Sequence, residues 1–391
     1  MKMRRLVLFS LVLVSVVGLA IAGSGFEYTE ADLASDEAKW AMYERWREHH
    51  NKPEISDDEK QQRFIVFMDT VKRVDAHNNN KEKKLYSLEL NKMSDVTFEE
   101  VGRFYTGNKL DDSFRSRSLG ARKNSSRVKR VDRHDIPKEW DWRQHNVVNP
   151  PRNQGQCGSC YAFAIIGALE STWAVKKGEL HQLSEQQLLD CWDCGEQWGG
   201  CNGASASMGF EYLAENGGST TQQAYPYNDP PKKGFCCPRR LQDRPVIPAG
   251  VQILPIDDEQ AVLEALAEHP VVIGMYLYDG FFNYKEVCIC YHHFIKLIIN
   301  QKIDRRIDFL QGIYTGEDCV GLERPHGVVA VGWGETPEGV KYWILKNSWG
   351  PDWGMDGYMY LVRQHTDDPR GACYMTMGTC FPVLDKPDDA A

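Results

Sequence analysis

Residues 151–173 read PRNQGQCGSCYAFAIIGALESTW, and this stretch decides the fold. Ile165, Leu169 and Trp173 recur at four-residue spacing, which predicts a buried helix that begins at Cys160. Backbone N–H groups and the helix dipole favour a thiolate at such a position. A cysteine at a helix start is also a common half of a disulfide in secreted proteins, so this stretch alone leaves both roles open.

Two later segments supply the groups that a thiolate nucleophile needs. PHGVVAVGWG (325–334) places His326 just before a β-branched run, and KYWILKNSWG (341–350) places Asn347 at the end of another. A lone histidine before a strand is usually a polar edge residue, and a lone asparagine usually belongs to a turn. Together with Cys160 they predict a nucleophile, an imidazole that shares its proton, and an amide that orients the imidazole.

These segments resemble the papain-like cysteine proteases, nearest to the cathepsin L type. The resemblance rests on QGQCGSCYAF (154–163), His326-Gly327 and KNSWG (346–350), and it covers nearly the whole chain after residue 22. It implies an α+β fold of two lobes, one helical around the helix that begins at the nucleophile and one an antiparallel, barrel-like sheet. It also implies a cysteine-type endopeptidase that works through an acyl-enzyme intermediate.

The resemblance assigns a role to each residue of the predicted active site. Cys160 is the nucleophile, His326 its ion-pair partner and Asn347 the residue that orients the imidazole. Trp349 shields that contact from water. Gln154 donates its side-chain amide to the oxyanion beside the backbone N–H of Cys160, whereas without its neighbours it would be an ordinary loop glutamine.

GGCNGASASM (199–208) resembles the wall whose backbone pairs with the substrate peptide, at Gly203 and Ala204. Ala204 stands where the family has a second glycine, which puts the backbone freedom at that position in doubt. By resemblance, four small residues line the main specificity pocket: Ala206, Gly274, Gly327 and Thr379. They predict a roomy pocket for a bulky apolar P2 side chain, with no acidic group to select arginine.

The first 22 residues predict a signal peptide. Lys2, Arg4 and Arg5 precede an apolar run, and Ala20 and Ala22 supply the small-x-small pattern of a cleavage site. An uncleaved membrane anchor is the alternative. The first interpretation predicts a protein of the secretory pathway, either lysosomal or extracellular.

Residues 23–133 resemble an inhibitory propeptide, followed by a mature domain at 134–391. Six positions between Glu59 and Asn78 and a second motif from Tyr86 to Asp95 carry this resemblance. It implies a zymogen, for which we hypothesise activation when acid weakens salt bridges around Asp95 and Glu59. Residues 113–133 are Ser/Arg-rich and predict an exposed, protease-sensitive linker with a glycosylation sequon at Asn124.

All 12 cysteines follow residue 156, which predicts a disulfide-bonded C-terminal domain. By resemblance the pairs are Cys157–Cys201, Cys191 with Cys236 or Cys237, and Cys319–Cys373. CWDC (191–194) with CC (236–237) also fits a zinc site, but an oxidising compartment favours two bridges. The partners of Cys194, Cys288, Cys290 and Cys380 stay open.

The net charge of −9 in 391 residues argues against a nucleic-acid partner. The resemblance implies protein or peptide substrates, the chain's own propeptide as an inhibitor, cystatin-type inhibitors, a monomer, and no metal or cofactor. The alternative function is that of a catalytically impaired homologue that acts as a binding or inhibitory protein, and the intact Cys160, His326, Asn347 and Gln154 argue against it.

One apolar segment does not fit the family spacing. His326 lies 166 residues after Cys160, whereas about 130–150 is usual. Without residues 287–311 the spacing becomes 141, and the flanks join as FFNYKEGIYTGEDC. We hypothesise a retained intron that is translated in frame. The segment begins with Val, whose codons start with GT, and ends with Phe-Leu-Gln, which a T-rich tract ending in CAG can encode, and these are the sequences found at intron edges. The alternatives are a genuine long loop, or a metal site built on its cysteines and on His292 and His293.

Overall fold

The computed structural model describes residues 25–80, 85–109, 114, 116–118, 136–193, 198–228, 231–285, 312–316, 319, 325–363 and 368–385. The predicted signal peptide, the sequon at Asn124 and the segment 287–311 lie outside these residues. The chain divides into two compact units, Met1–His77 with Glu89–Asp95, and Asn78–Leu88 with Val96–Ala391. We describe each unit by itself.

The first unit is built on two helices, α2 (Asp36–His49) and α3 (Asp57–Asn78), preceded by the short 3-10 helix η1 (Glu30–Leu33). Residues 50–56 separate α2 from α3 and include Pro53, which cannot continue a helix. Aromatic rings join the two helices, with the Trp46 and Phe67 ring centroids 4.8 Å apart. The helical spacing of the apolar residues on α3 brings them to this contact.

Two ion pairs connect the propeptide motifs within the first unit. Lys52 Nζ lies 2.7 Å from Asp95 Oδ1, and the Asp95 side chain is fully buried. Arg63 Nε lies 2.9 Å from Glu59 Oε1 and also donates through Nη1 to the backbone oxygen of Asp95. The salt bridges that the sequence predicts around Asp95 and Glu59 are therefore present in this unit.

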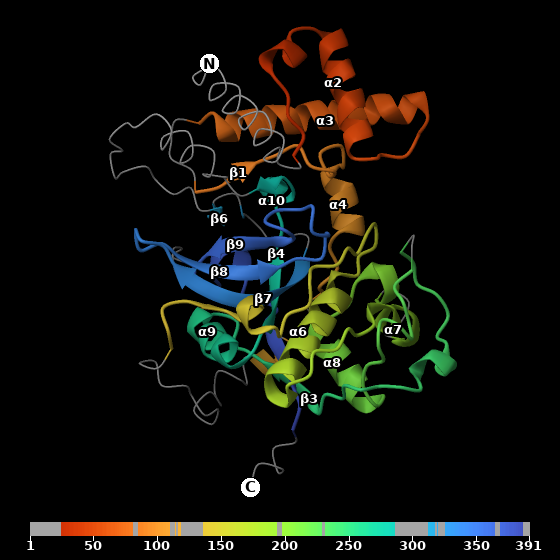
Figure 1. The fold of residues 1–391 in the computed structure, drawn as a ribbon, viewed down its shortest axis with the longest axis vertical. Helices are drawn as coiled ribbons and strands as arrows, with labels where there is room; N and C mark the ends of the chain where they lie inside the picture. The colour runs from red at the N-terminus through yellow and green to blue at the C-terminus, as the bar shows by residue number, and fades with distance from the viewer. Residues whose placement is uncertain are drawn as a thin grey trace, which may run out of the picture. The chain divides into compact units, whose positions relative to one another are not determined.

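The second unit combines helices with one large sheet (Figure 1). Its helices are α4 (Phe98–Phe104), η2 (Trp142–His145), α6 (Cys160–Lys177), α7 (Glu185–Cys191), η3 (Gly200–Asn202), α8 (Ala206–Glu215), η4 (Pro238–Leu241), α9 (Glu259–Glu268), α10 (Asp279–Phe282) and η5 (Ala372–Tyr374). Within the described part of the chain, no helix has both the length and the apolar composition that would let it cross a membrane.

The strands of the sheet run in the order β3-β10-β4-β7-β8-β9-β6, and β2 also pairs with β7. They are β2 (Trp140–Asp141), β3 (Gly250–Ile253), β4 (Val271–Tyr276), β6 (Ile313–Tyr314), β7 (Pro325–Glu335), β8 (Lys341–Lys346), β9 (Tyr358–Val362) and β10 (Cys380–Val383). A separate two-stranded ladder joins β1 (Ser87–Leu88) to β5 (Tyr284–Lys285). All pairs are antiparallel except β6 with β9, so an α+β architecture is confirmed.

Helix α6 is the central element of the second unit. Most of its residues are buried on every side, as expected for a helix without a polar face. It packs against β7, where a methyl group at Gly167 would lie 3.2 Å from Val329 Cγ2. The helix ends at Gly178, whose φ of +79° suits a glycine cap. The predicted buried helix beginning at Cys160 is thus confirmed.

The start of the predicted exposed linker is partly buried, so the prediction is wrong for these residues. Phe114 is 1% exposed and belongs to the hydrophobic core around α6. Ser118 is also buried, and its hydroxyl donates to the backbone oxygen of Leu254 at 3.0 Å. One large apolar side chain is enough to anchor a segment whose average composition is polar.

The two flanks of the segment 287–311 lie side by side. The Tyr284 hydroxyl donates to the backbone oxygen of Gly312 and accepts from the backbone N–H of Tyr360 at 3.2 Å. Residues 85–88 also bridge the flanks, because Ser87 pairs with Lys285 and the Ile313 N–H donates to the Leu85 oxygen at 2.9 Å. A chain that passes directly from one flank to the other needs no rearrangement of these contacts.

We therefore expect that deleting residues 287–311, which joins Glu286 to Gly312, leaves the precursor folded. Its melting temperature and soluble yield should equal or exceed those of the full chain, because a long loop no longer has to be closed. Thermal unfolding of both forms measures this. A deletion variant that aggregates, while the full chain stays soluble, would show that the segment belongs to the folded structure. Sequencing of the transcript separately decides whether the segment is a retained intron.

Candidate active site

Cys160 is the first residue of α6 and is completely buried. The backbone N–H of Gly327 donates to its sulfur at 3.4 Å. Gly327 follows His326 on β7, so the packing of α6 on β7 brings the thiol next to the histidine-bearing strand. The predicted nucleophile is therefore located at a helix N-terminus, where backbone N–H groups stabilise a thiolate.

The imidazole of His326 is held by Asn347, which directly follows β8. His326 Nε2 lies 2.8 Å from Asn347 Oδ1, and the same oxygen accepts the backbone N–H of Ser348 at 2.8 Å. Because Oδ1 is an acceptor in both contacts, Nε2 carries the proton of the neutral ring. The Nδ1 lone pair is then available to take a proton from a thiol.

Aromatic rings cover this pair. The Trp349 ring lies 4.9 Å from the His326 ring at an angle of 38°, and Phe281 stands edge-on to Trp349 at 5.5 Å. His326 is fully buried and Trp349 is 1% exposed. The predicted position of Trp349 against the histidine matches this geometry, which keeps water from the bond between His326 and Asn347.

Gln154 is buried and held at both ends of its amide. Its Oε1 accepts from the Ser348 hydroxyl at 2.5 Å, and its Nε2 donates to the Cys157 oxygen at 2.8 Å. A second Nε2 proton remains for another acceptor, because an amide nitrogen has two. The Gln154 backbone N–H also bonds to the Ser348 oxygen at 2.8 Å. These bonds tie the predicted oxyanion donor to the residue that follows Asn347.

Burial keeps both reacting groups neutral in this form of the protein. It raises the pKa of the Cys160 thiol to about 12, and the N–H groups of Gly327 and Asn108 offset only part of that shift. Burial also lowers the pKa of His326 to about 4, against the opposing effect of its bond to Asn347. At neutral pH the site therefore holds a thiol and a neutral imidazole.

The burial comes from residues 105–109, which we call the crossing segment. Ala204 N–H donates to the Gly107 oxygen at 2.8 Å, and Lys109 N–H donates to the Ala204 oxygen at 3.0 Å. On the other side, the N–H groups of Gly107 and Asn108 donate to the Pro325 oxygen. The segment thus occupies the space between residue 204 and residue 325 as an added strand, running parallel to Ala204.

The crossing segment passes the site only because Gly107 has no side chain. A methyl group there would lie 2.1 Å from the Gly158 oxygen and 3.1 Å from Gly203 Cα. On the wall itself, Gly203 has the positive φ of +84°, whereas Ala204 lies outside the left-handed region. Alanine therefore causes no backbone strain at position 204.

The side chain of Asn108 enters a small cavity lined by Gly274, Met275, Tyr276, Pro325, Met377 and Gly378. Two predicted pocket residues, Gly274 and Gly327, lie against the Asn108 side chain. Gly378 faces the cavity where Thr379 was predicted, while Thr379 is buried and donates its hydroxyl to the Met375 oxygen at 2.9 Å. Ala206 is buried at the start of α8.

The cavity lining includes five residues that the sequence did not predict: Met275, Tyr276, Pro325, Met377 and Gly378. Residues 375–378 form a turn between η5 and β10, and neither a strand nor a helix period predicts from the sequence which turn residues face a cavity.

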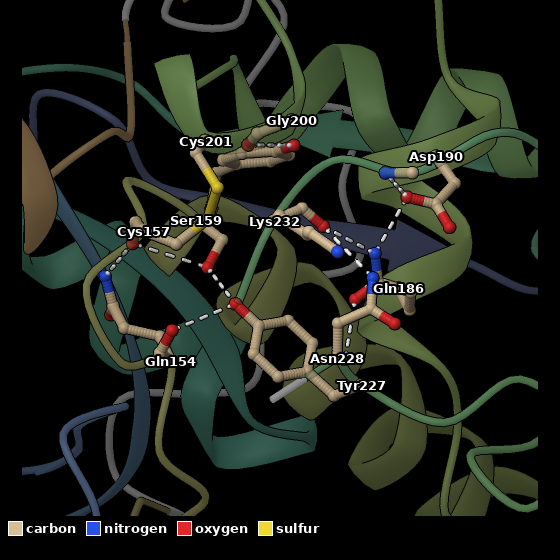
Figure 2. The surroundings of a disulfide bond; sticks show 12 residues. Gln154, Cys157, Ser159, Gln186, Asp190, Gly200, Cys201, Tyr227, Asn228 and Lys232 are labelled. Carbon is tan, nitrogen blue, oxygen red and sulfur yellow. Dashed lines mark hydrogen bonds between the residues drawn. A yellow bond between two sulfur atoms is a disulfide. The ribbon is translucent and has the colours of Figure 1, made fainter. Parts of the chain in front are cut away.

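Among the described residues of the second unit there are three disulfides: Cys157–Cys201, Cys191–Cys236 and Cys319–Cys373. The second disulfide shows that Cys236, and not Cys237, is the partner of Cys191. Figure 2 shows how the first one ties the loop before the nucleophile to the substrate wall, where Gly158 N–H also bonds to the Cys201 oxygen at 3.1 Å.

The remaining cysteines give no metal site in the part that the structure describes. Cys380 is a buried thiol and Cys237 a partly exposed one, neither in a disulfide among the described residues. No group of three or more His, Cys, Asp or Glu side chains is arranged to hold a metal ion there. Cys194, Cys288, Cys290, His292 and His293 lie outside the described residues.

Comparison with known families and relatives gives matches over nearly the whole chain. Residues 136–383 match the model of the papain family cysteine proteases, and residues 43–101 match that of the cathepsin propeptide inhibitor domain. Vignain of Vigna mungo is 35% identical, covering 100% of this chain and 97% of its own length. Vignain of Ricinus communis is 37% identical, covering 97% of this chain and 95% of its own length.

A solved structure matches as well. The proform of the Amb a 11 cysteine protease, a ragweed pollen allergen, has 32% identity and a TM-score of 0.72, and the match covers 93% of this chain and 98% of that one. The chain belongs to the papain family of cysteine proteases, as an endopeptidase precursor that carries a cathepsin-type inhibitory propeptide domain.

Proposed function

We propose that this chain matures into a secreted cysteine endopeptidase of the cathepsin L type that cleaves protein and peptide substrates. One observation carries the proposal. The hydrogen bond from His326 Nε2 to Asn347 Oδ1 leaves Nδ1 to receive the proton of Cys160, which starts α6 beside Gly327. The complete set of groups argues against a catalytically impaired binding or inhibitory protein.

The proposed reaction begins when the Cys160 thiol passes its proton to His326 Nδ1 and the thiolate attacks the scissile carbonyl carbon. The oxygen that becomes negative accepts hydrogen bonds from Gln154 Nε2 and from the Cys160 N–H. His326 then protonates the leaving amine, and an acyl-enzyme thioester remains. Water attacks the thioester, His326 takes its proton, and the carboxylic acid and the Cys160 thiol are released.

The crossing segment supports the proposal that the precursor inhibits itself. It pairs in parallel with Ala204 of the predicted wall, and the Asn108 side chain lies in the cavity described above. Burial under it holds His326 and Cys160 in their neutral forms. Release of the segment admits water, after which proton transfer to the imidazole becomes favourable.

The cavity around Asn108 supports an apolar P2 preference. Met275, Tyr276 and Met377 give it an apolar lining. Asn108 Oδ1 is buried there and has no hydrogen-bond partner within the described residues, so asparagine leaves a polar atom unpaired in the cavity. An apolar substrate side chain would leave no polar atom unpaired.

The remaining proposals rest on the sequence. They are a signal peptide at 1–22, glycosylation at Asn124, a lysosomal or extracellular location, cystatin-type inhibitors as partners, and a monomeric enzyme. The family resemblance supports the last two, and the sequence motifs support the others.

An epoxide inhibitor of cysteine proteases should label the matured protein at Cys160 and leave the precursor unlabelled. The crossing segment covers the thiol in the precursor, so labelling should appear in step with peptidase activity during maturation. Mass spectrometry of both forms measures this. The Cys160→Ser variant serves as the control, and a matured protein that stays unlabelled would favour the impaired-homologue alternative.

Acid should promote release of the propeptide through His326. The ring has a pKa of about 4 in the covered site and about 6.5 when exposed, so between these values the open form binds a proton that the closed form does not. The resulting stabilisation of the closed form is complete above about pH 6.5 and is lost as the pH falls towards 4, by at most about 3 kcal/mol.

This can be measured on the inactive Cys160→Ala precursor, by cleavage of its propeptide with an added protease between pH 7 and pH 4. Cleavage should accelerate as the pH falls, and adding His326→Gln should flatten the profile. Cleavage of the denatured precursor at each pH corrects for the added protease. An unchanged profile in the double variant would instead assign the acid response to the ion pairs of Asp95 and Glu59.

Asn108→Leu should slow maturation, because leucine fills the apolar cavity without leaving an unpaired oxygen. Relief of such a group amounts to about 1–3 kcal/mol, so we expect about a tenfold slower release at constant pH. Asn108→Ser is the matched control and should mature at least as fast as the wild type.

The matured enzyme should likewise prefer Leu over Asn or Arg at P2 of short peptides, and equal rates for the three would contradict the pocket assignment.

A further inference from the structure

Tyr227 connects the two segments that surround the nucleophile. Its hydroxyl lies 3.0 Å from the backbone oxygen of Gln154 and 2.8 Å from the hydroxyl of Ser159, the residue before Cys160. Figure 2 shows the three side by side, next to the Cys157–Cys201 disulfide. None of the motifs that identify the active site contains Tyr227.

The proton positions in this chain of bonds follow from the available donors. A backbone oxygen can only accept, so the Tyr227 O–H must donate to Gln154. A tyrosine has one proton, so the contact between Tyr227 and Ser159 needs the serine proton, and its 2.8 Å length outweighs the 3.5 Å contact of the Ser159 hydroxyl with the Cys157 oxygen. Burial raises the pKa of Tyr227, so its hydroxyl keeps this proton across the working pH range of the enzyme.

The tyrosine is itself held in place. Its ring stands edge-on to Phe163, one turn into α6, with centroids 5.0 Å apart. The side chain of Gln154 is already fixed by Ser348 and Cys157, whereas Tyr227 holds the Gln154 backbone. The Tyr227 hydroxyl therefore fixes the position of Gln154, the amide donor, relative to the start of α6, where the Cys160 N–H lies.

We propose that Tyr227 is a positioning residue for the oxyanion site, because it sets the distance between the two donors, Gln154 Nε2 and the Cys160 N–H. The proposal rests on the role given above to Gln154. Tyr227 touches no substrate atom and acts only through Gln154 and Ser159. Its loss should impair the step in which negative charge develops on the carbonyl oxygen and leave substrate binding unaffected.

The test is the Tyr227→Phe variant, which removes one oxygen and keeps the ring against Phe163. We expect kcat of the matured enzyme to fall about five- to twentyfold with KM changed less than about twofold, since small misplacements of catalytic groups cost rates of this order. Alkylation of Cys160 by iodoacetamide develops no oxyanion and should keep its wild-type rate. Equal losses in alkylation and in kcat would point to general distortion and overturn the proposal.

A double-mutant cycle tests whether Tyr227 acts through Gln154. Gln154→Ala alone should reduce kcat strongly, and adding Tyr227→Phe should then cost less than about twofold. Independent, multiplying effects of the two changes would contradict the positioning role. If Tyr227→Phe fails to mature, Ser159→Ala provides a second route, since it should lower kcat and lose this effect in the Gln154→Ala background.

Tyr225→Phe is the matched control. Tyr225 lies two residues away, and its hydroxyl donates to Asp190 Oδ2 at 2.8 Å, away from the active site. This variant should lose thermal stability but keep kcat within about twofold, whereas a fall of kcat equal to that of Tyr227→Phe would overturn the proposal. A wild-type matured protein without any peptidase activity would contradict the proposed function itself, which separates the two failures.

Discussion

The packing of α6 against β7 is the constraint on which the active site depends. Small residues allow the close approach, since a methyl group at Gly167 would already press on Val329. The approach sets Cys160, the first residue of the helix, against the backbone of Gly327 and thereby beside His326. A second link joins residues 152–154 to residues 348–350, where Asn153 pairs with Trp349. Nucleophile, imidazole and amide donors thus come from four separate segments held by two backbone contacts.

The burial that holds the site together also keeps the Cys160 thiol and the His326 imidazole in their neutral forms. Under the crossing segment the thiol and the imidazole both lose their contact with water, and a low dielectric penalises the charged form of each. In the proposed mechanism, release of the crossing segment would therefore change the protonation of both groups as well as the access to them. The crossing segment can pass so close to the site because residue 107 is a glycine. A side chain there would collide with the backbone of Gly158 and Gly203.

Much of the catalytic arrangement could be predicted from the sequence, because its residues lie in short motifs whose local context is specific. The helix that begins at Cys160, the contact of Asn347 with His326 and the place of Trp349 agree with the structure. Other expectations depended on average composition or on counting residues. The linker prediction overlooked that Phe114 reaches the core, and the pocket prediction named Thr379, which does not line the cavity around Asn108.

The sequence by itself determined the family of the chain and its inhibitory propeptide domain, and it predicted the reacting groups, since these depend on motifs that are continuous along the chain. Only the tertiary structure decided that Cys191 pairs with Cys236, that Asn108 fills the pocket, and that Tyr227 bridges Gln154 and Ser159. Each of these contacts joins residues that are distant in sequence. Packing in three dimensions selects which of several chemically equivalent residues makes each contact, and no local sequence pattern predicts that selection.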